Sequence, residues 1–180
     1  EFGHVHIAQL LIEKGADIDQ ANNKGCSPLL LACRNGHIDA VRLLIEQGAD
    51  VSQADIWGGY PLFVACQKGH ADIVRLLTAR GVDVGQASNS SSTPLLMACV
   101  SGHVDVVRLL IEQGADVSQA ANNGDSPLFT ACMFDHADVV RLLLRGGADM
   151  NQATETGATP LSRAREHSAA GHPPEGSAAN

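Results

Sequence analysis

Apolar residues follow a helical spacing in short segments of the chain, and these segments recur along its length. In the segment from 38 to 47, Val41, Leu44 and Ile45 fall at positions that share one face of a helix. A second short helix is expected before each such segment. The residues between one helix pair and the next show no helical pattern, which indicates an extended connection. The pattern therefore predicts an all-α chain built from repeated helix pairs.

Several residue types recur with the same 33-residue period, so chance does not explain the repetition. Near-identical phrases begin at five glycines: Gly15, Gly48, Gly81, Gly114 and Gly147. Proline recurs at the same interval from Pro28 to Pro160, and a Ser or Thr precedes most of these prolines, as Ser27 does. A capping hydroxyl followed by proline is a strong helix start, because proline presets φ and lacks an N–H that would be unpaired there. Glycine after the second helix permits a left-handed cap.

The period divides the chain into one predicted domain, residues 1–168. Four full repeats, numbered 1 to 4 here, span 22–54, 55–87, 88–120 and 121–153, and partial repeats cover 1–21 and 154–168. The polar last repeat is expected to cap the C-terminal end, whereas residues 1–21 lack the first helix that would cover them. We therefore expect a piece of a longer array, monomeric but able to self-associate weakly through this uncapped N-terminal edge. The tail, 169–180, is expected to be disordered.

The motifs TPL, AC, GH, VVRLL and GAD, or close variants of them, follow one another in each full repeat. This order resembles the ankyrin repeat family over about residues 3–165. The resemblance implies a solenoid of stacked antiparallel helix pairs with projecting β-turn fingers, in which neighbouring repeats supply the core. It also implies a protein–protein interaction module that binds another protein through a concave face of fingertips and first helices. The alternative is a passive structural or engineered scaffold segment of a longer ankyrin array, without a partner of its own.

Composition narrows the classes of function further. Hydrophobic residues make up 44% of the chain and charged residues 18%, as in a soluble globular protein. No apolar run approaches the roughly 18 residues that a membrane-spanning helix needs, so no membrane insertion is expected. The net charge of −8 argues against nucleic acid as a partner, because nucleic-acid-binding proteins usually carry a basic patch, and it favours a partner with a basic surface.

Eight histidines and five cysteines invite a search for metal or catalytic chemistry. Equivalent residues of stacked repeats should lie about one helix spacing apart, roughly 8–10 Å, which is too far for a disulfide or a shared zinc shell. Buried core thiols are therefore predicted for one column of first-helix cysteines: Cys33, Cys66, Cys99 and Cys132. Cys26 lies in a finger and is expected to be free and exposed. Free thiols favour an intracellular location, in the cytoplasm or the nucleus.

No phosphate-binding loop, nucleophile elbow or paired-cysteine zinc motif is present, so neither catalysis nor a cofactor or metal is expected. In the family that the chain resembles, the repeated Gly-His pair is structural, with the histidine hydrogen-bonded in the inter-helix loop. One modification is a candidate, because Asn151 matches the GADVN phrase that can be hydroxylated in ankyrin repeats, with Leu143 eight residues earlier. The favoured interpretation of Asn151 is a turn asparagine that bonds local backbone.

Positions that vary between repeats are free of the demands of the shared fold, and they mark the candidate binding face. They fall in the fingers and at the ends of the first helices. The candidate binding residues are Lys24, Arg34, Ile56, Trp57, Tyr60, Gln67, Lys68, Val100, Met133 and Phe134. Exposed aromatic residues are enriched in interface hot spots, so the expected anchors are Ile56, Trp57, Tyr60, Met133 and Phe134. The alternative is that Trp57 folds back on its own repeat, and that Phe134 packs locally because Asp135 replaces the usual glycine.

Overall fold

The computed structural model describes the backbone of residues 2–170 and the side chains of residues 5–165. Within the described chain every regular element is a helix, which confirms the predicted all-α fold class. The helices are α1 (Phe2–Glu13), α2 (Pro28–Asn35), α3 (Ile38–Glu46), α4 (Pro61–Lys68), α5 (Ala71–Thr78), α6 (Pro94–Ser101), α7 (Val104–Glu112), α8 (Pro127–Met133), α9 (Ala137–Arg145) and α10 (Pro160–Ala170).

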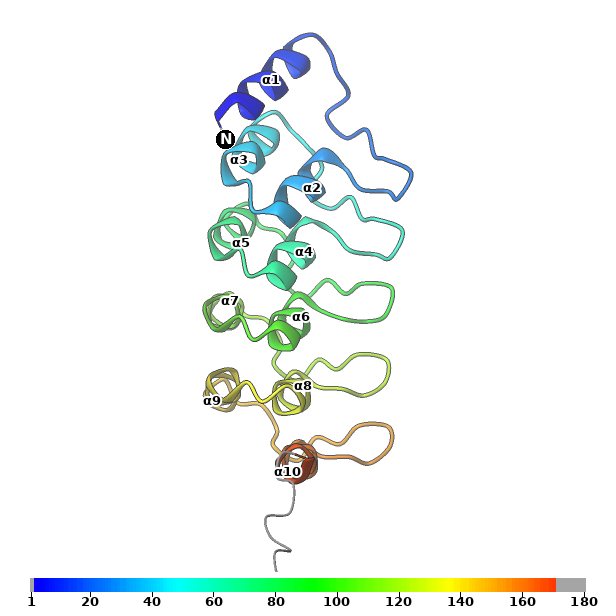
Figure 1. The fold of residues 1–180 in the computed structure, drawn as a ribbon, viewed down its shortest axis with the longest axis vertical. Helices are drawn as coiled ribbons and strands as arrows, with labels where there is room; N and C mark the ends of the chain where they lie inside the picture. Colours follow the sequence, from blue (N-terminus) through cyan, green and yellow to red (C-terminus); the bar gives the residue numbers. More distant parts are fainter. Residues whose placement is uncertain (1, 171–180) are drawn as a thin grey trace, which may run out of the picture.

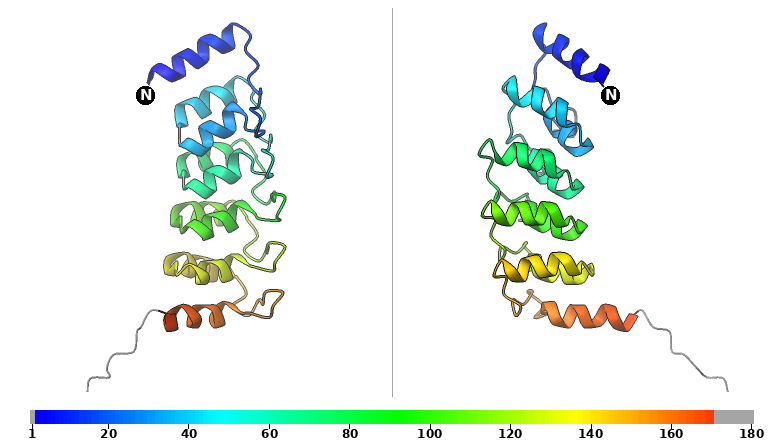
Figure 2. Two further views of the ribbon diagram at one scale, coloured as in Figure 1. Left: turned by 45° about the vertical axis from the view of Figure 1, so that its right-hand side comes forward. Right: turned by 90° about the vertical axis from the view of Figure 1, so that its left-hand side faces the viewer.

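The helices form two parallel stacks, and hairpin-like fingers project from the side of one stack (Figure 1). The first helices α2, α4, α6, α8 and α10 stack on one another, and the second helices lie behind them in a separate row (Figure 2). Each finger is closed by backbone hydrogen bonds, as between Asp55 N–H and the Gly59 carbonyl at 2.8 Å. We call the surface formed by the fingers and the first helices the finger face; it is the counterpart of the predicted concave face.

The first helices begin where hydroxyl caps were expected. The Ser27 hydroxyl accepts a hydrogen bond from Leu30 N–H at 3.2 Å, and Thr93 and Ser126 make the equivalent bonds. Each of these caps is followed by proline at the first helical position. A cap of this kind contributes about 1 kcal/mol to helix stability.

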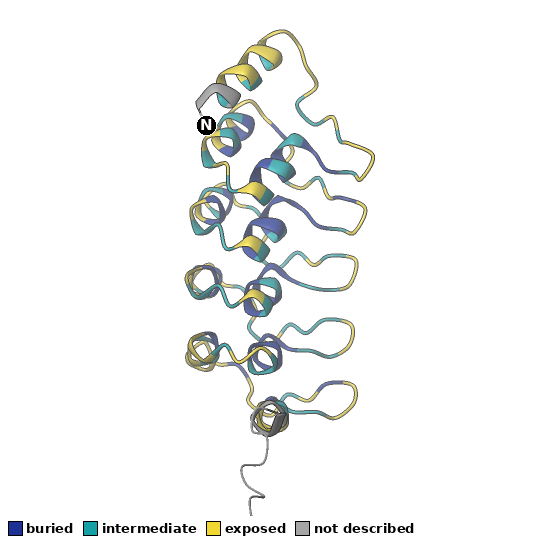
Figure 3. Ribbon diagram, in the orientation of Figure 1, coloured by how far each residue is buried: buried dark blue, intermediate teal, exposed yellow. Residues whose placement is uncertain are grey.

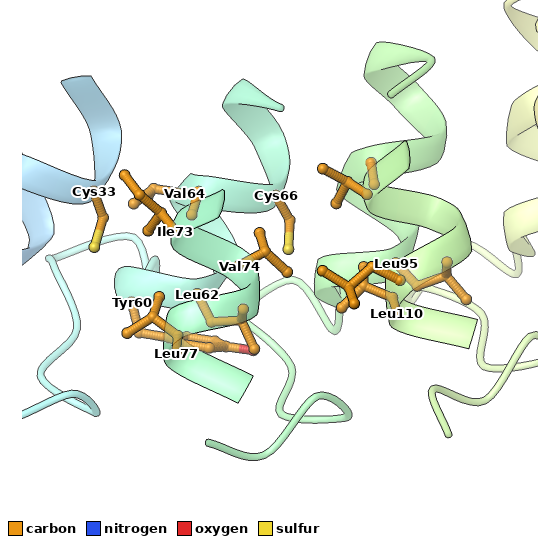
Figure 4. Packing of buried hydrophobic residues seen from close by; sticks show 14 of the residues in the cluster. Cys33, Tyr60, Leu62, Val64, Cys66, Ile73, Val74, Leu77, Leu95 and Leu110 are labelled. Carbon is orange, nitrogen blue, oxygen red and sulfur yellow. The ribbon is translucent and has the colours of Figure 1, made fainter. Parts of the chain in front are cut away.

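The core lies between the two helix stacks, and the fingertips remain exposed (Figure 3). Cys33, Cys66 and Cys99 are buried in it, whereas Cys132, also predicted to be buried, is half-buried and packs against it. Figure 4 shows Cys33 and Cys66 on successive first helices among apolar side chains such as Val64. All five cysteines are free thiols. Burial raises the pKa of Cys33 and Cys99 to about 12, so both thiols stay protonated and unreactive at neutral pH.

The histidines before the second helices bond repeats 2, 3 and 4 to the repeat that precedes each of them. His103 Nε2 lies 3.1 Å from the Gln67 carbonyl oxygen, and His70 and His136 make the equivalent contact with the repeat before them. The bond therefore crosses between repeats, whereas the resemblance implied a bond within one inter-helix loop. Gly69 has φ +77°, and a Cβ there would lie 2.6 Å from the His103 ring. Glycine is therefore required at Gly69 by both the backbone conformation and its histidine neighbour.

Asp135 stands where the other repeats have this glycine, and it adopts the same left-handed conformation, with φ +56°. In the sequence, Ala169 occupies the position of the next histidine. At this 33-residue interval the sequence therefore has no counterpart of the histidine that packs on the glycine of the other repeats.

The helices at both ends of the described chain expose apolar residues. Ile7, Leu10 and Leu11 are exposed on α1, and α10 exposes Leu161 beside polar residues such as Ser162 and Arg165. Helix α10 extends to Ala170 and so includes the first two residues of the expected disordered tail. The rest of that predicted tail, 171–180, lies outside the described residues.

Candidate protein-binding site

Four of the predicted binding residues meet at one hollow of the finger face. A cavity of about 460 Å³ lies between the fingers of repeats 2 and 3 and is floored by α4 and α6. We call it the Trp57 groove; the predicted residues that line it are Arg34, Trp57, Gln67 and Lys68. A wall of serines, Ser88, Ser90 and Ser92, faces them from the next finger, with their hydroxyl oxygens linked at 3.1 Å.

A second hollow, of about 480 Å³, lies between the finger of repeat 1 and α2. Lys24, Cys26, Leu31 and Arg34 line it, together with two finger asparagines. We call it the Lys24 hollow. Because Arg34 lines both hollows, they adjoin each other across this side chain.

The buried carboxylate of Asp55 fixes the finger that carries Trp57. Asp55 Oδ1 accepts hydrogen bonds from Trp57 N–H at 3.0 Å and from Gly59 N–H at 2.9 Å. Its other oxygen pairs with the Arg34 guanidinium at 3.0 Å. The Asp55 side chain is 4% exposed and that of Arg34 is 30% exposed, so this ion pair is largely withdrawn from water. Arg34 is therefore part of the structure that holds the finger, in addition to its predicted place on the binding face.

Trp57 extends into solvent at the rim of the groove. Its residue is 58% exposed, which contradicts the alternative that the ring folds back on its own repeat. Ile56, the preceding residue, is 60% exposed but does not line the groove. The two neighbours therefore differ in placement and not in exposure.

Comparison with known families fits this architecture. A model described as "Ankyrin repeats (3 copies)" matches residues 1–55 and 52–121, and a model described as "Ankyrin repeat" matches 123–155. The chain belongs to the ankyrin repeat family. Ankyrin repeat proteins are typically non-enzymatic modules that bind other proteins. A comparison with curated proteins finds no match.

Two further features of this ankyrin chain bear on its chemistry. Among the described residues, no group of three or more His, Cys, Asp or Glu side chains is arranged to hold a metal ion. None of the helices in the described part is both long enough and apolar enough to cross a membrane.

Tyr60 was expected on the binding face, and this prediction is wrong. It is fully buried, its hydroxyl donates to the Gln86 carbonyl, and its ring centroid lies 5.9 Å from that of Phe63. Burial raises the pKa of the phenol above its ordinary value. Tyr60 occupies the cap position of α4, and the chain there turns its side chain into the core, where the ring packs and the hydroxyl finds a backbone acceptor. Figure 4 shows it beside Leu62 and Leu77.

Cys26 was expected to be exposed, and it is buried. Its sulfur lies 3.7 Å from Arg34 Nη1 and 3.9 Å from the Lys24 carbonyl oxygen, under the finger. The finger packs on α2 and does not stand free of it.

The other predicted anchors lie apart from the groove. Phe134 is 45% exposed, and its ring stacks on His136 with 6.2 Å between centroids, so the alternative of local packing describes it in part. Met133 and Val100 are half-buried, and neither lines the Trp57 groove. The structure therefore does not unite the aromatic residues of repeats 2 and 4 into one site.

Three apolar residues that line the groove, Phe63, Val64 and Met97, were missed by the sequence interpretation. Phe63 belongs to a column of large apolar residues, which predicts a core position. The column of Met97 varies between repeats: Leu31, Val64, Met97 and Thr130. This variation between repeats could have identified Met97 as a candidate binding residue. No feature of the sequence separates Phe63 from an ordinary core residue.

Asn151 lies in an exposed turn. Its N–H donates to the Asp149 carboxylate at 2.8 Å, and its side chain makes no hydrogen bond within the described residues. The aspartate, and not the asparagine side chain, therefore holds this turn. Hydroxylation of Asn151 stays a prediction.

Proposed function

We propose that this ankyrin domain binds a partner protein through its finger face, with the Trp57 groove at the centre of the interface. The observation that carries the proposal is a large aromatic side chain, more than half exposed, beside a groove that other apolar side chains line. Tryptophan is the residue most enriched in interface hot spots, together with tyrosine and arginine. Burying its exposed area against a partner would add to affinity.

The fixed finger supports the same proposal. Asp55 holds the backbone of the Trp57 finger through two N–H donors and anchors it to Arg34. A contact residue on an ordered backbone loses less entropy on binding than one on a mobile loop. The arrangement therefore favours recognition over a passive scaffold segment, for which the finger face needs no exposed aromatic residue.

The proposal includes no catalysis and no cofactor. Buried, protonated thiols such as Cys33 and Cys99 are poor nucleophiles, which agrees with a binding role. We further propose an intracellular location, in the cytoplasm or the nucleus, which the five free thiols support because such compartments keep thiols reduced. A monomeric state is part of the proposal.

A matched pair of variants tests the proposed function. Wild type, Trp57→Ala and Ile56→Ala serve as baits in extracts of the source cells, and retained proteins are quantified by mass spectrometry. We expect proteins that wild type and Ile56→Ala retain and Trp57→Ala loses. Both side chains are exposed, so each change should alter the free energy of unfolding by less than about 0.5 kcal/mol.

A retained set that does not depend on Trp57 would contradict the proposal, and so would equal loss with both variants. A large drop in the stability of Trp57→Ala would also contradict it, because the tryptophan would then be a structural residue. Sedimentation velocity over a range of concentrations tests the monomeric state.

A further inference from the structure

We infer that the Trp57 groove and the adjoining Lys24 hollow together bind an extended acidic–apolar peptide segment of the partner. An aromatic or aliphatic side chain of the segment would pack in the groove against Trp57, and a neighbouring acidic side chain would pair with Lys68, Lys24 or Arg34. This inference rests on the proposed function and adds the chemistry of the partner to it.

The local charge of the two hollows is opposite to that of the whole chain. The chain carries a net charge of −8, yet the charged residues lining the groove are Arg34, Lys68 and Asp55. Asp55 is buried and accepts from two backbone N–H groups as well as from Arg34, so its charge is already compensated. Lys68 is exposed and is in none of the described ion pairs. The groove therefore presents a net positive charge to a ligand.

The Lys24 hollow has the same polarity. Lys24 and Arg34 are the charged members of its lining. Because Arg34 is already paired with Asp55, Lys24 supplies the net positive charge of this hollow. Arg34 has five N–H donors, and its described contacts engage Nη2 with Asp55 and Nη1 with the Cys26 sulfur. Charges beyond about 8 Å are largely screened at physiological salt, so a bound ligand responds mainly to the charges that line the two hollows.

Basic residues are confined to one end of the finger face formed by the full repeats. Fingers and first helices of repeats 1 and 2 supply Lys24, Arg34 and Lys68, whereas the corresponding segment of repeat 3, residues 88–101, has no charged residue. The segment of repeat 4, 121–134, contributes only the acidic Asp125. An acidic ligand is therefore favoured at repeats 1 and 2, where Trp57 lies, and not along the whole face.

The groove also offers an apolar surface for side chains of a peptide ligand and hydrogen-bonding groups for its backbone. Trp57, Phe63 and Met97 line it, and the flexible thioether of methionine adapts to ligand side chains of different shape. The serine hydroxyls on the facing wall can donate to or accept from peptide groups of an extended chain. Two shallow hollows in succession across neighbouring fingers fit a linear segment better than a single compact group.

Selection from a random 12-residue peptide display library tests the inference without a known partner. Immobilised wild-type protein is panned, enriched peptides are sequenced, and individual peptides are measured by fluorescence anisotropy. We expect enriched peptides that combine Asp or Glu with an aromatic or aliphatic residue, and binding that weakens as salt is raised. Enriched sequences that are basic or without charge preference would overturn the inference, as would a selection without enrichment over blank beads.

Charge-reversal variants locate the effect. Lys68→Glu and Lys14→Glu change the net charge equally, and both lysines are exposed, but only Lys68 lines the groove. We expect Lys68→Glu to weaken binding of the enriched peptides about tenfold and Lys14→Glu to weaken it less than about twofold. Ser90→Glu, which adds a negative charge on the facing wall, should also weaken binding. Equal losses for both lysine variants would overturn the inference.

The outcomes separate the inference from the proposed function. Peptides that lose binding with Trp57→Ala but show no acidic preference would overturn the inference and leave the proposed function standing. Peptides that bind Trp57→Ala as well as wild type would contradict both. A concentration-dependent dimer of wild type that Trp57→Ala abolishes would show a second copy as the occupant of the groove, and the inference would fall.

Discussion

Repeats 2 and 4 both depart from the repeat pattern with aromatic residues, and the structure treats the two departures differently. In repeat 2, Trp57 stands exposed beside a groove on a finger that Asp55 holds. In repeat 4, Phe134 lies against His136, next to an aspartate in a glycine position. Gly69 of repeat 2 is covered by the histidine of the next repeat, whereas the position that would cover Asp135 holds Ala169.

Residues that vary between repeats do so for different physical reasons. A residue can depart from the pattern because it has a role of its own, or because the neighbour that imposed the pattern is missing. Repeat 2 packs against a full repeat on each side. Its residues that differ from the repeat pattern therefore do so although both neighbours constrain the packing. After Asp135 the sequence has Ala169 and not a histidine at the equivalent position, so variation at Asp135 is weaker evidence for function.

The largest change in stability is expected when alanine replaces Gly69 or Asp135, which occupy equivalent positions in repeats 2 and 4. Gly69→Ala should destabilise the domain by about 3 kcal/mol, from left-handed strain and displacement of the His103 ring. Asp135→Ala, in the same column without a covering histidine, should cost less than about 1 kcal/mol. Urea unfolding of both variants measures the difference. Equal costs would show that the histidine imposes no constraint and would remove the basis of the comparison.

A second prediction concerns the finger that carries Trp57. Asp55→Ala should lower the free energy of unfolding by about 2 kcal/mol, because it leaves Arg34 and two finger N–H groups without their acceptor. The loss is smaller than for a fully buried ion pair, because Arg34 is partly exposed to water. Asp55→Asn keeps an acceptor oxygen and should cost less. Thermal or urea unfolding measures both, and amide hydrogen exchange at Trp57 should accelerate in Asp55→Ala. A finger that stays protected in Asp55→Ala would contradict the role given to this carboxylate.

Prediction from sequence succeeded where the signal was local and repeated. Caps such as Ser27 and helix-ending glycines act within one turn of chain, so their pattern alone predicts the helix pairs. It failed at Tyr60 and Cys26, because whether a finger residue points inward depends on space left by neighbouring repeats. Phe63 was missed for a related reason, since a large apolar residue can line a groove as readily as a core.

The smallest predicted effect concerns turns that repeats 1 and 3 share. Hydrogen bonds from the Ser52 hydroxyl, and then from the Ser52 N–H, lower the pKa of Asp50, and Ser118 does the same for Asp116. Because the folded pKa is depressed, this stabilisation is present above the unfolded pKa and is lost as pH falls through the folded one. Ser52→Ala and Ser118→Ala should each raise the pKa of the paired aspartate, measured by NMR titration. No shift in either variant would contradict the assignment of the serine hydroxyl as the main cause.

The most direct test of the central claim uses the protein's single tryptophan. Intrinsic fluorescence of wild type is titrated with a protein or peptide that binds the domain. If the Trp57 groove is the centre of the interface, the indole leaves water on binding, and its emission shifts to shorter wavelength in proportion to occupancy. Saturable binding, shown independently by anisotropy or calorimetry, with unchanged tryptophan emission would show that the interface does not include the Trp57 groove.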